Sequence, residues 1–402
     1  MYFDRTLSSI VKNANLTFPV VLITGPRQVG KSTLFEKICE PDRTVLTLDD
    51  PKILALAKDD PALFLQTYKP PLFIDEIQYA PELFPYIKMA VDREKQKGMF
   101  WLTGSQPFQL MKRVSESLAG RVAILELQGL SQAERFGRQG IAFVPDTLQA
   151  DNRPSLPIND VYELILKGSY PELNASPDMK RSLFYSSYLK TYIERDIRSL
   201  AKITDEHRFV QFISVVAART AQLLNYDDMA HDVGVSVNTI KMWISLLETS
   251  GLIYLLHPYH NNLTNRVIKT PKLYFLDTGL CSYLTGWDAI ETISAGAMNG
   301  AFLETYVISE ILKSYLHTGK NAKFYFYRDK EKREIDLLIE RNGKYYPVEV
   351  KRSASPSNDD VRHFNVLEKL KIPAGKGAIV CLYEQLLPLN RDVDIVPISY
   401  LG

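Results

Sequence analysis

The segment from Gly25 to Thr33 has the spacing of a phosphate-binding loop, G-x-x-x-x-G-K-[ST], between an apolar run and a helical pattern. Its glycines would let backbone N–H groups surround a β-phosphate, and the helix N-terminus would add the positive end of its dipole. Lys31 would reach the β- and γ-phosphate oxygens, and the Ser32 hydroxyl would take one Mg²⁺ position. We therefore predict that ATP and Mg²⁺ are bound by Gly25, Pro26, Arg27, Gln28, Val29, Gly30, Lys31, Ser32 and Thr33.

Two adjacent acids follow a later apolar run. Asp75, at the end of that expected strand, would hold Mg²⁺ through water, and Glu76 would orient or polarise the attacking water. Such a pair is typical of a hydrolase, because a kinase would not place a water-activating acid beside the γ-phosphate. The run at residues 99–103 also ends in polar residues, which predicts that Ser105 or Gln106 lies beside the γ-phosphate and senses it.

Arg121 is a candidate arginine finger, a cation that would reach a neighbouring subunit's γ-phosphate and stabilise charge in the transition state. An ordinary surface arginine explains this residue equally well. Four other cations are weaker candidates for the same role, namely Lys112, Arg113, Arg195 and Arg198.

Residues 226–254 have the pattern of a helix-turn-helix followed by a wing strand. Gly234 would lie in the turn, and Ser236 would cap the second helix. Four apolar residues at helical spacing would face the core, namely Ile240, Trp243, Ile244 and Leu247. Asn238 and Lys241 then remain as candidate DNA contacts. Because this face carries a single cation, and DNA readers usually make several phosphate contacts, a winged helix used for packing or assembly is the alternative.

The C-terminal part contains a second group of acids around an expected β-hairpin. Asn342-Gly343 is typical of a two-residue type I′ turn. Counting outward from this turn pairs Asp336 with Glu349 and puts Lys351 on the same face. Like charges in direct opposition are destabilising, and a divalent cation such as Mg²⁺ would relieve that cost. The alternative is a hairpin with solvated charges. The opposite face would be apolar, with Ile335, Leu337, Ile339, Tyr346, Val348 and Val350.

The elements that must position these residues are visible as patterns along the chain. Short apolar runs near residues 20–24, 45–49, 72–75, 99–103 and 123–127 alternate with helical patterns, which predicts a parallel sheet covered on both faces. We expect a multidomain α/β chain. Its segments would be a P-loop ATPase core at 1–150, a helical lid or linker at 151–222, a winged helix at 223–290 and a smaller mixed α/β domain at 291–402.

The composition sets limits on partners and location. There are 48 Lys and Arg against 47 Asp and Glu, so nucleic-acid contact would need a local basic patch. The three cysteines lack metal-ligand spacing, which fits a reducing compartment. We find no secretory signal pattern and no stretch of about 18 uninterrupted apolar residues. We therefore expect a cytoplasmic protein without a membrane partner.

Several segments resemble a family of prokaryotic AAA+-type ATPases in which the ATPase domain precedes a domain of unknown function. The similar segments are Thr24–Thr33, Leu48–Pro51, Ile74–Gln78, Leu102–Ser105 and Leu118–Arg121, with Gly168–Glu172 and Leu276–Leu280 in the second half. The resemblance spans nearly the whole chain. It implies an AAA+ (ASCE-type) fold, with Asp75, Glu76 and Ser105 in the roles given above.

The C-terminal hairpin and its acids resemble the restriction-endonuclease-like fold of the PD-(D/E)XK nucleases. This resemblance implies that Glu304, in the expected helix from Ala301 to Ile308, is the first-helix acid of the site. It would join Asp336, Glu349 and Lys351. An inactive domain of this fold is the alternative.

Together these patterns favour a Mg²⁺-dependent ATPase that binds and remodels or translocates on DNA, branched DNA included. The winged-helix and nuclease-like domains would contact the DNA. An arginine finger in trans needs a neighbour, so we expect a homo-oligomer, with a hexameric ring as one form. Three alternatives remain: a slow ATP-dependent switch that gates a toxin or defence partner protein, an ATP-regulated Mg²⁺-dependent nuclease, and an ATP-dependent scaffold.

Overall fold

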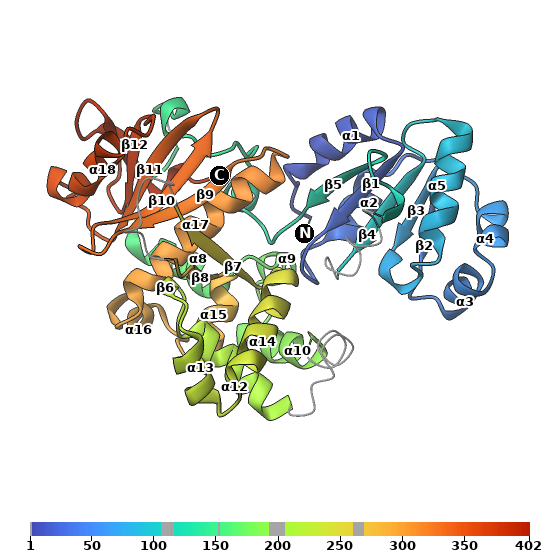
Figure 1. Ribbon diagram of the computed structural model, residues 1–402, viewed down its shortest axis with the longest axis horizontal. Coiled ribbons are helices and arrows are strands. Elements are labelled where there is room, and N and C mark those ends of the chain that lie inside the picture. Colours follow the sequence, from blue (N-terminus) through green and yellow to red (C-terminus); the bar gives the residue numbers. More distant parts are fainter. Residues whose placement is uncertain (1, 106–113, 115, 152, 193–205, 260–268) are drawn as a thin grey trace. The chain divides into compact units, whose positions relative to one another are not determined.

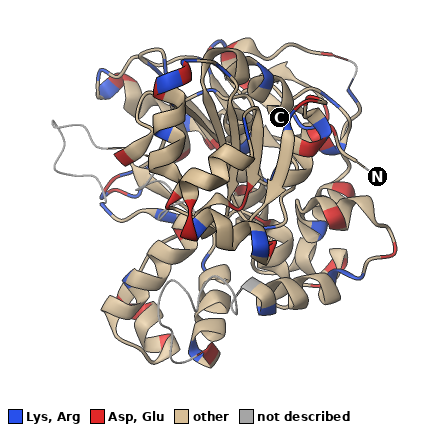
Figure 2. Cartoon of the chain, turned by 90° about the vertical axis from the view of Figure 1, so that its right-hand side faces the viewer, with Lys and Arg blue, Asp and Glu red and all other residues tan. Residues whose placement is uncertain are grey.

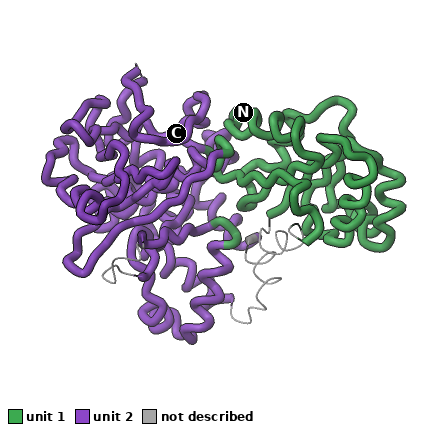
Figure 3. Tube along the Cα trace, turned by 45° about the horizontal axis from the view of Figure 1, so that its top comes forward, with its two compact units in different colours: residues 1–130, 249–251, 316–319 green, residues 131–248, 252–315, 320–402 purple. Residues whose placement is uncertain are grey.

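The computed structural model describes residues 2–105, 114, 116–151, 153–192, 206–259 and 269–402. The chain divides into two compact units (Figure 3). Unit 1 contains residues 1–130, 249–251 and 316–319, and unit 2 contains residues 131–248, 252–315 and 320–402. The four segments expected from the sequence remain a prediction.

Unit 1 is built on a parallel sheet of five described strands in the order β2-β3-β4-β1-β5 (Figure 1). The strands and helices are α1 (Leu7–Thr17), β1 (Val20–Thr24), α2 (Lys31–Ile38), β2 (Thr44–Thr47), α3 (Pro51–Asp59), α4 (Pro61–Thr67), β3 (Leu72–Asp75), η1 (Ile77–Tyr79), α5 (Leu83–Glu94), β4 (Phe100–Gly104) and β5 (Val122–Glu126). The predicted parallel sheet is therefore confirmed. Strand β4 lies between β1 and β3, so the ends of these three strands meet at one edge.

The three central strands β1, β3 and β4 are buried on both faces, to which their successive side chains point in turn. On one face, apolar residues of β1, β3 and β4 pack with α3, α4 and α5 in a single cluster. On the other face, Phe35 of α2 stacks on Trp101 at 4.7 Å and meets Phe73 edge-on at 5.0 Å. Burial on both faces explains why the sequences of these strands are continuous apolar runs.

Unit 2 begins with a largely helical part. Its helices and short strand up to the helix pair are α7 (Gln132–Arg135), η2 (Pro145–Thr147), α8 (Ile158–Lys167), α9 (Pro171–Ala175), α10 (Arg181–Tyr192), α12 (Glu206–Ala217) and β6 (Gln222–Leu223). Asp277 joins this part to a later segment, because its carboxylate accepts hydrogen bonds from Ser169 and from Tyr185 of α10.

The predicted helix-turn-helix pattern corresponds to α13 (Tyr226–Val233) and α14 (Val237–Thr249), followed by β7 (Ile253–Pro258). Gly234 ends α13 with φ 72°, and Ser236 Oγ accepts a hydrogen bond from Thr239 N at 3.1 Å. The four predicted core residues of the second helix are at most 4 % exposed, namely Ile240, Trp243, Ile244 and Leu247. These local predictions are confirmed.

The rest of unit 2 is a mixed sheet with helices around it. Its nine described strands have the order β13-β14-β12-β11-β10-β9-β7-β8-β6. The remaining elements are β8 (Lys272–Phe275), α15 (Thr278–Leu284), α16 (Ile290–Ala295), α17 (Asn299–His317), β9 (Lys323–Arg328), β10 (Glu334–Arg341), β11 (Lys344–Lys351), η4 (Asn358–Phe364), α18 (Asn365–Lys369), β12 (Gly377–Cys381), β13 (Leu387–Pro388), β14 (Val393–Pro397) and η5 (Ile398–Tyr400). Because β7 pairs with β9, the strands after the helix pair continue into the hairpin sheet.

The hairpin of β10 and β11 has the predicted register, with Arg341 opposite Lys344 and Leu337 opposite Val348. Asn342 and Gly343 both have positive φ, as a type I′ turn requires. The expected alternation of faces is wrong at one position. The pairing with β9 shifts between Ile335 and Leu338, so a β-bulge puts these two residues in one hydrophobic cluster.

Candidate functional site

The phosphate loop leaves β1 at Gly25, where a side chain would have no room. A Cβ at this position would lie 2.0 Å from the carbonyl oxygen of Leu127, and φ is 138°. The loop then reaches Gly30, whose φ of 88° starts α2. Among the residues that the structure describes, no side chain caps the first turn of α2, and that turn carries no acid. Its N–H groups and the positive dipole end therefore suit a phosphate.

Lys31 is buried within this loop, with 6 % of its surface exposed. Its ammonium donates hydrogen bonds to the carbonyl oxygens of Gly25 at 3.0 Å and Pro26 at 2.7 Å. These contacts hold a cation inside the bend of the loop. The donor set fits the triphosphate of ATP, since a lysine cation and the N–H groups of a helix N-terminus are the groups that bind phosphate oxygens in such loops.

The other loop residues differ in exposure. Pro26 and Val29 are buried, whereas Gln28 and Thr33 are exposed. Arg27 is half-buried and donates to the Tyr79 hydroxyl at 3.4 Å.

Arg5 supports the loop from a distant part of the chain. Its guanidinium is buried and donates to the carbonyl oxygens of Val29 and Gln128, both at 2.7 Å. The residues lie 24 and 123 positions away from Arg5. A single arginine near the N-terminus carries no sequence signal for such a role, and the sequence analysis missed it.

Asp75 lies at the end of β3, and its Oδ1 accepts two hydroxyl hydrogen bonds. Ser32 Oγ donates at 2.7 Å, and Thr103 Oγ1 also donates. The hydroxyl oxygen of Thr103 in turn accepts a hydrogen bond from the Glu76 amide at 3.2 Å. The structure thus brings together Ser32 and Asp75, the two side chains predicted to hold Mg²⁺. Thr103 was missed, although a polar residue near the end of β4, the neighbour of β3, was an available signal.

Glu76 has φ 56° and ψ 45°, a left-handed conformation that costs roughly 1–2 kcal/mol for a residue with a side chain. Its Oε2 accepts hydrogen bonds from Ser105 Oγ at 3.2 Å and from Gln78 Nε2. Gln78 Nε2 also lies 3.2 Å from Ser105 Oγ, so the three side chains form a closed triangle. Such a triangle fixes the direction of a carboxylate that would act on a water molecule. Gln78 is a third residue, after Arg5 and Thr103, for which no role was predicted.

Arg121 lies apart from these contacts and pairs with Asp92. Its Nε is 2.6 Å from Asp92 Oδ1, and its Nη2 is 3.1 Å from Oδ2, a bidentate pair of two partly exposed side chains. The hydrogen bonds from Arg121 lower the pKa of the Asp92 carboxyl. The other predicted cations, Lys112, Arg113, Arg195 and Arg198, lie outside the described residues, and so does Gln106.

Comparison with family models agrees with this geometry. Residues 17–136 match a model described as "AAA domain". This part of the chain is a P-loop ATPase domain of the AAA type. Two further models are each described as a domain of unknown function. The first (DUF8612) matches residues 158–291, and the second (DUF4143) matches residues 299–401. A P-loop ATPase domain implies nucleotide binding, so this part of the prediction is confirmed.

Similar proteins outside these models add little about the rest of the chain. Uncharacterized proteins of Mycobacterium bovis and Mycobacterium tuberculosis are each 28% identical over 401 residues, which covers 98% of this chain and 83% of theirs. Among solved structures, the Walker-type ATPase of Pyrococcus abyssi has a TM-score of 0.45 and 15% identity, and the match covers 70% of this chain and 96% of that chain. For the RuvB Holliday junction branch migration motor of Thermotoga maritima, the TM-score is 0.29 and the identity 19%, with 62% and 86% covered.

No helix in the described part of the chain has both the length and the apolar character needed to cross a lipid bilayer.

The predicted DNA contacts lie on the exposed side of α14. Asn238 and Lys241 are both exposed, and the Lys241 ammonium lies 5.6 Å from the centre of the Tyr226 ring. The helix before them, α13, has Asp227 and Asp228 in its first turn. Basic and acidic residues are interspersed along the described ribbon (Figure 2). The face therefore offers one exposed cation from α14 beside an acidic helix terminus.

The four residues of the predicted nuclease-like site are close to other charges. Glu304 and Asp336 lie near the ammonium of Lys272, whereas Glu349 pairs with Lys351 at 2.7 Å. Burial and the neighbouring Asp336 raise the pKa of Glu304 to about 7 and that of Glu349 to about 8. The position of Lys272 beside these acids was not predicted from the sequence.

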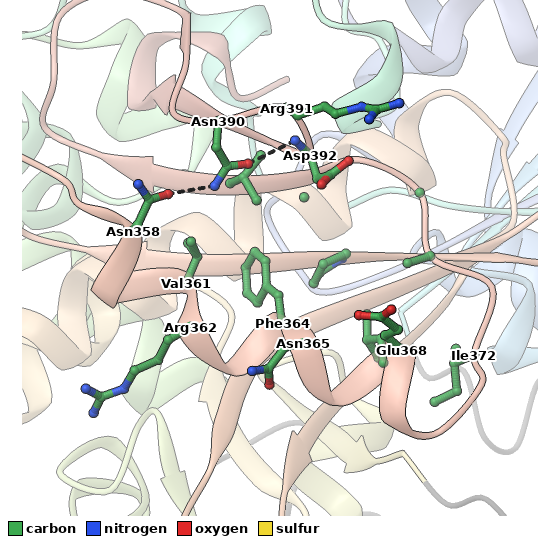
Figure 4. Close-up of a pocket in the computed structure, with 16 residues that line it drawn as sticks. Asn358, Val361, Arg362, Phe364, Asn365, Glu368, Ile372, Asn390, Arg391 and Asp392 are labelled. Carbon is green, nitrogen blue, oxygen red and sulfur yellow. Dashed lines mark hydrogen bonds between the residues drawn. The ribbon is translucent and has the colours of Figure 1, made fainter.

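A cavity of about 720 Å³ lies elsewhere in unit 2, along η4 and α18 (Figure 4). Phe364 lies in its middle, and Asn390 bridges its rim by donating to Asn358 Oδ1 at 2.7 Å. The charges of the lining residues cancel, because two arginines, Arg362 and Arg391, are matched by two acids, Glu368 and Asp392. None of the site residues predicted from the sequence lines this cavity.

Proposed function

We propose that the chain is a Mg²⁺-dependent ATP hydrolase that works on DNA. The observation that carries the hydrolase part is the hydrogen bond between Ser32 and Asp75, with Glu76 held beside it by Ser105 and Gln78. Mg²⁺ bound with ATP would neutralise charge on the phosphate oxygens. Ser32 and Asp75 would hold it, directly and through water.

The chain's own side chains would then divide the remaining work. Lys31 would exchange its loop carbonyl partners for the β- and γ-phosphate oxygens. Glu76 would orient the attacking water and accept its proton, while Ser105 and Gln78 keep the carboxylate aimed. Thr103 would position both acids, since its hydroxyl contacts the Asp75 carboxylate and the Glu76 amide.

Substitution of Arg121 tests whether one subunit contributes an arginine to the ATP site of its neighbour. As an arginine finger in trans, it would leave Asp92 and reach the neighbouring site, so Arg121→Ala should lower turnover by about 10³-fold or more. Mixing this variant with Lys31→Ala subunits should restore part of the activity, because an intact site would then meet an intact finger. Turnover is measured as phosphate release, with Arg93→Ala, at an exposed arginine, as the control. An unchanged rate in Arg121→Ala would assign the residue to surface pairing.

The DNA part of the proposal is supported by the helix pair α13 and α14, with Asn238 and Lys241 exposed on the second helix. Helix-turn-helix proteins place such residues in the major groove. We expect DNA to raise ATP turnover. Lys241→Ala should weaken DNA binding about equally for all sequences and lower the salt dependence of log affinity by about 1.

The experiment is an ATPase and binding assay with duplex, branched and single-stranded DNA, with the size of the protein measured with and without ATP. Lys320→Ala, at an exposed lysine of the same unit, is the matched control and should keep the wild-type salt slope. Turnover that no DNA form changes, together with an absence of DNA binding, would overturn the DNA part and leave the hydrolase part standing.

A second candidate is a nucleotide switch that gates a protein partner. Two features of the helix pair favour it: Asp227 and Asp228 are unfavourable next to DNA phosphates, and the apolar Met242 of α14 is 45 % exposed. Stimulation of turnover by a protein and not by any DNA would identify this function.

A further inference from the structure

Lys272, the first residue of β8, has a buried side chain whose ammonium lies among three carboxylates. Its Nζ is 3.1 Å from Glu304 Oε1, 2.5 Å from Glu334 Oε1 and 3.6 Å from Asp336 Oδ1. Glu304 belongs to α17, and the other two acids belong to β10. The lysine therefore joins three elements through ion pairs in a site that is largely closed to solvent.

Each of these acids also has a second donor. Tyr274 donates its hydroxyl at 2.7 Å to Glu304 Oε1, the same oxygen that faces Lys272, and Arg328 lies 3.2 Å from Glu334 Oε2. Asp336 Oδ2 accepts the amide of Val350 at 2.9 Å. The three acids are thus already paired with donors of the protein itself.

A divalent cation does not fit this arrangement. A nuclease of the resembled fold would bind Mg²⁺ between Asp336 and Glu349, with Glu304 nearby, yet two of these three acids already face the ammonium of Lys272. A metal ion bound to Asp336 Oδ1 would also be repelled by the neighbouring ammonium, which carries the same sign of charge. Within the described ranges, no three His, Cys, Asp or Glu side chains are grouped so that they could hold a metal ion.

We propose that Lys272 takes the place of the metal ion in this cluster, so that the C-terminal domain of the chain does not cut nucleic acid. The ammonium relieves the repulsion among the acids that a metal would otherwise relieve. It also ties β8, which pairs with the strand after the helix pair, to α17 and β10. The cluster thus links β10 and α17 to β8, the partner of the strand that follows α13 and α14.

Mn²⁺ is the probe, because it favours oxygen ligands and its free form is measured by electron paramagnetic resonance. The full chain is titrated without nucleotide in an Asp75→Asn background, so that the phosphate site contributes no metal binding. In the chain that keeps Lys272, we expect no Mn²⁺ site that depends on Asp336, so Asp336→Asn should leave Mn²⁺ binding unchanged. Lys272→Met should create such a site, with affinity raised by about tenfold or more once the like charge is gone.

Each result of this titration either supports the proposal or overturns it. A Mn²⁺ site in the chain with Lys272 that disappears in Asp336→Asn would overturn the proposal, and so would a folded Lys272→Met variant that binds no Mn²⁺. Circular dichroism shows whether Lys272→Met folds. If Lys272→Met does not fold, the effect of Asp336→Asn on Mn²⁺ binding by the chain that keeps Lys272 still decides whether the proposal stands. Lys272→Arg, which keeps the charge, is the control and should bind no Mn²⁺.

Discussion

Glu76→Gln should bind ATP as tightly as the wild type and hydrolyse it about 10² to 10⁴ times more slowly, the range that a positioned general base contributes. The amide has the shape of the carboxylate but accepts no proton from water. It would still accept the hydrogen bond of Ser105, so the local structure should persist. Hydrolysis is followed as phosphate release, and binding is followed with a fluorescent ATP analogue in the presence of Mg²⁺.

Two comparisons make this result specific. Glu82→Gln changes an exposed glutamate six positions further along and should keep the wild-type rate. Lys31→Ala should lose binding as well as turnover, because its ammonium is the cation inside the loop. Wild-type turnover in Glu76→Gln would remove the assigned role of Glu76, and hydrolysis would then need another base.

Much of the ATPase domain was predictable because its signals are local. The phosphate loop is a continuous stretch of nine residues, and each of the three central strands is a short apolar run whose burial on both faces follows from the parallel sheet. The turn at Asn342-Gly343 fixes the register of its hairpin for the same reason. Patterns of this kind depend on neighbours within a few residues, and a single sequence displays them directly.

The missed features depend on contacts between distant residues. Arg5 reaches a carbonyl 123 positions away, and Lys272 reaches an acid 32 positions away. The bulge between Ile335 and Leu338 was missed as well, although the three consecutive apolar residues Leu337, Leu338 and Ile339 interrupt the alternation there. These features arise when strands from different segments are placed side by side, and pairings such as that of β7 with β9 are set by the tertiary fold.

The two segments that carried the family resemblance outside the ATPase domain meet at one buried carboxylate. Asp277 accepts hydrogen bonds from Ser169 N at 2.6 Å, Ser169 Oγ at 2.7 Å and Leu280 N at 2.7 Å. Tyr185 donates the fourth, at 2.9 Å to Oδ1. Burial and the nearby Asp277 raise the pKa of Tyr185 well above its usual value, so this phenol remains a donor. The motif residues are thus explained by packing and need no part in ATP chemistry.

Asp277→Ala should therefore lower the free energy of unfolding of unit 2 by about 3–5 kcal/mol, because it strands several buried donors at about 1–3 kcal/mol each. The change is measured by urea unfolding followed by circular dichroism, with Asp178→Ala at an exposed position as the control. Asp277→Asn should lower the free energy of unfolding by an amount between those of Asp277→Ala and the control. Its amide nitrogen would face a donor whose hydrogen bond the carboxylate now accepts. A loss below about 1 kcal/mol in Asp277→Ala would mean that water replaces the carboxylate at these donors, and that the two motifs are held together by their apolar contacts.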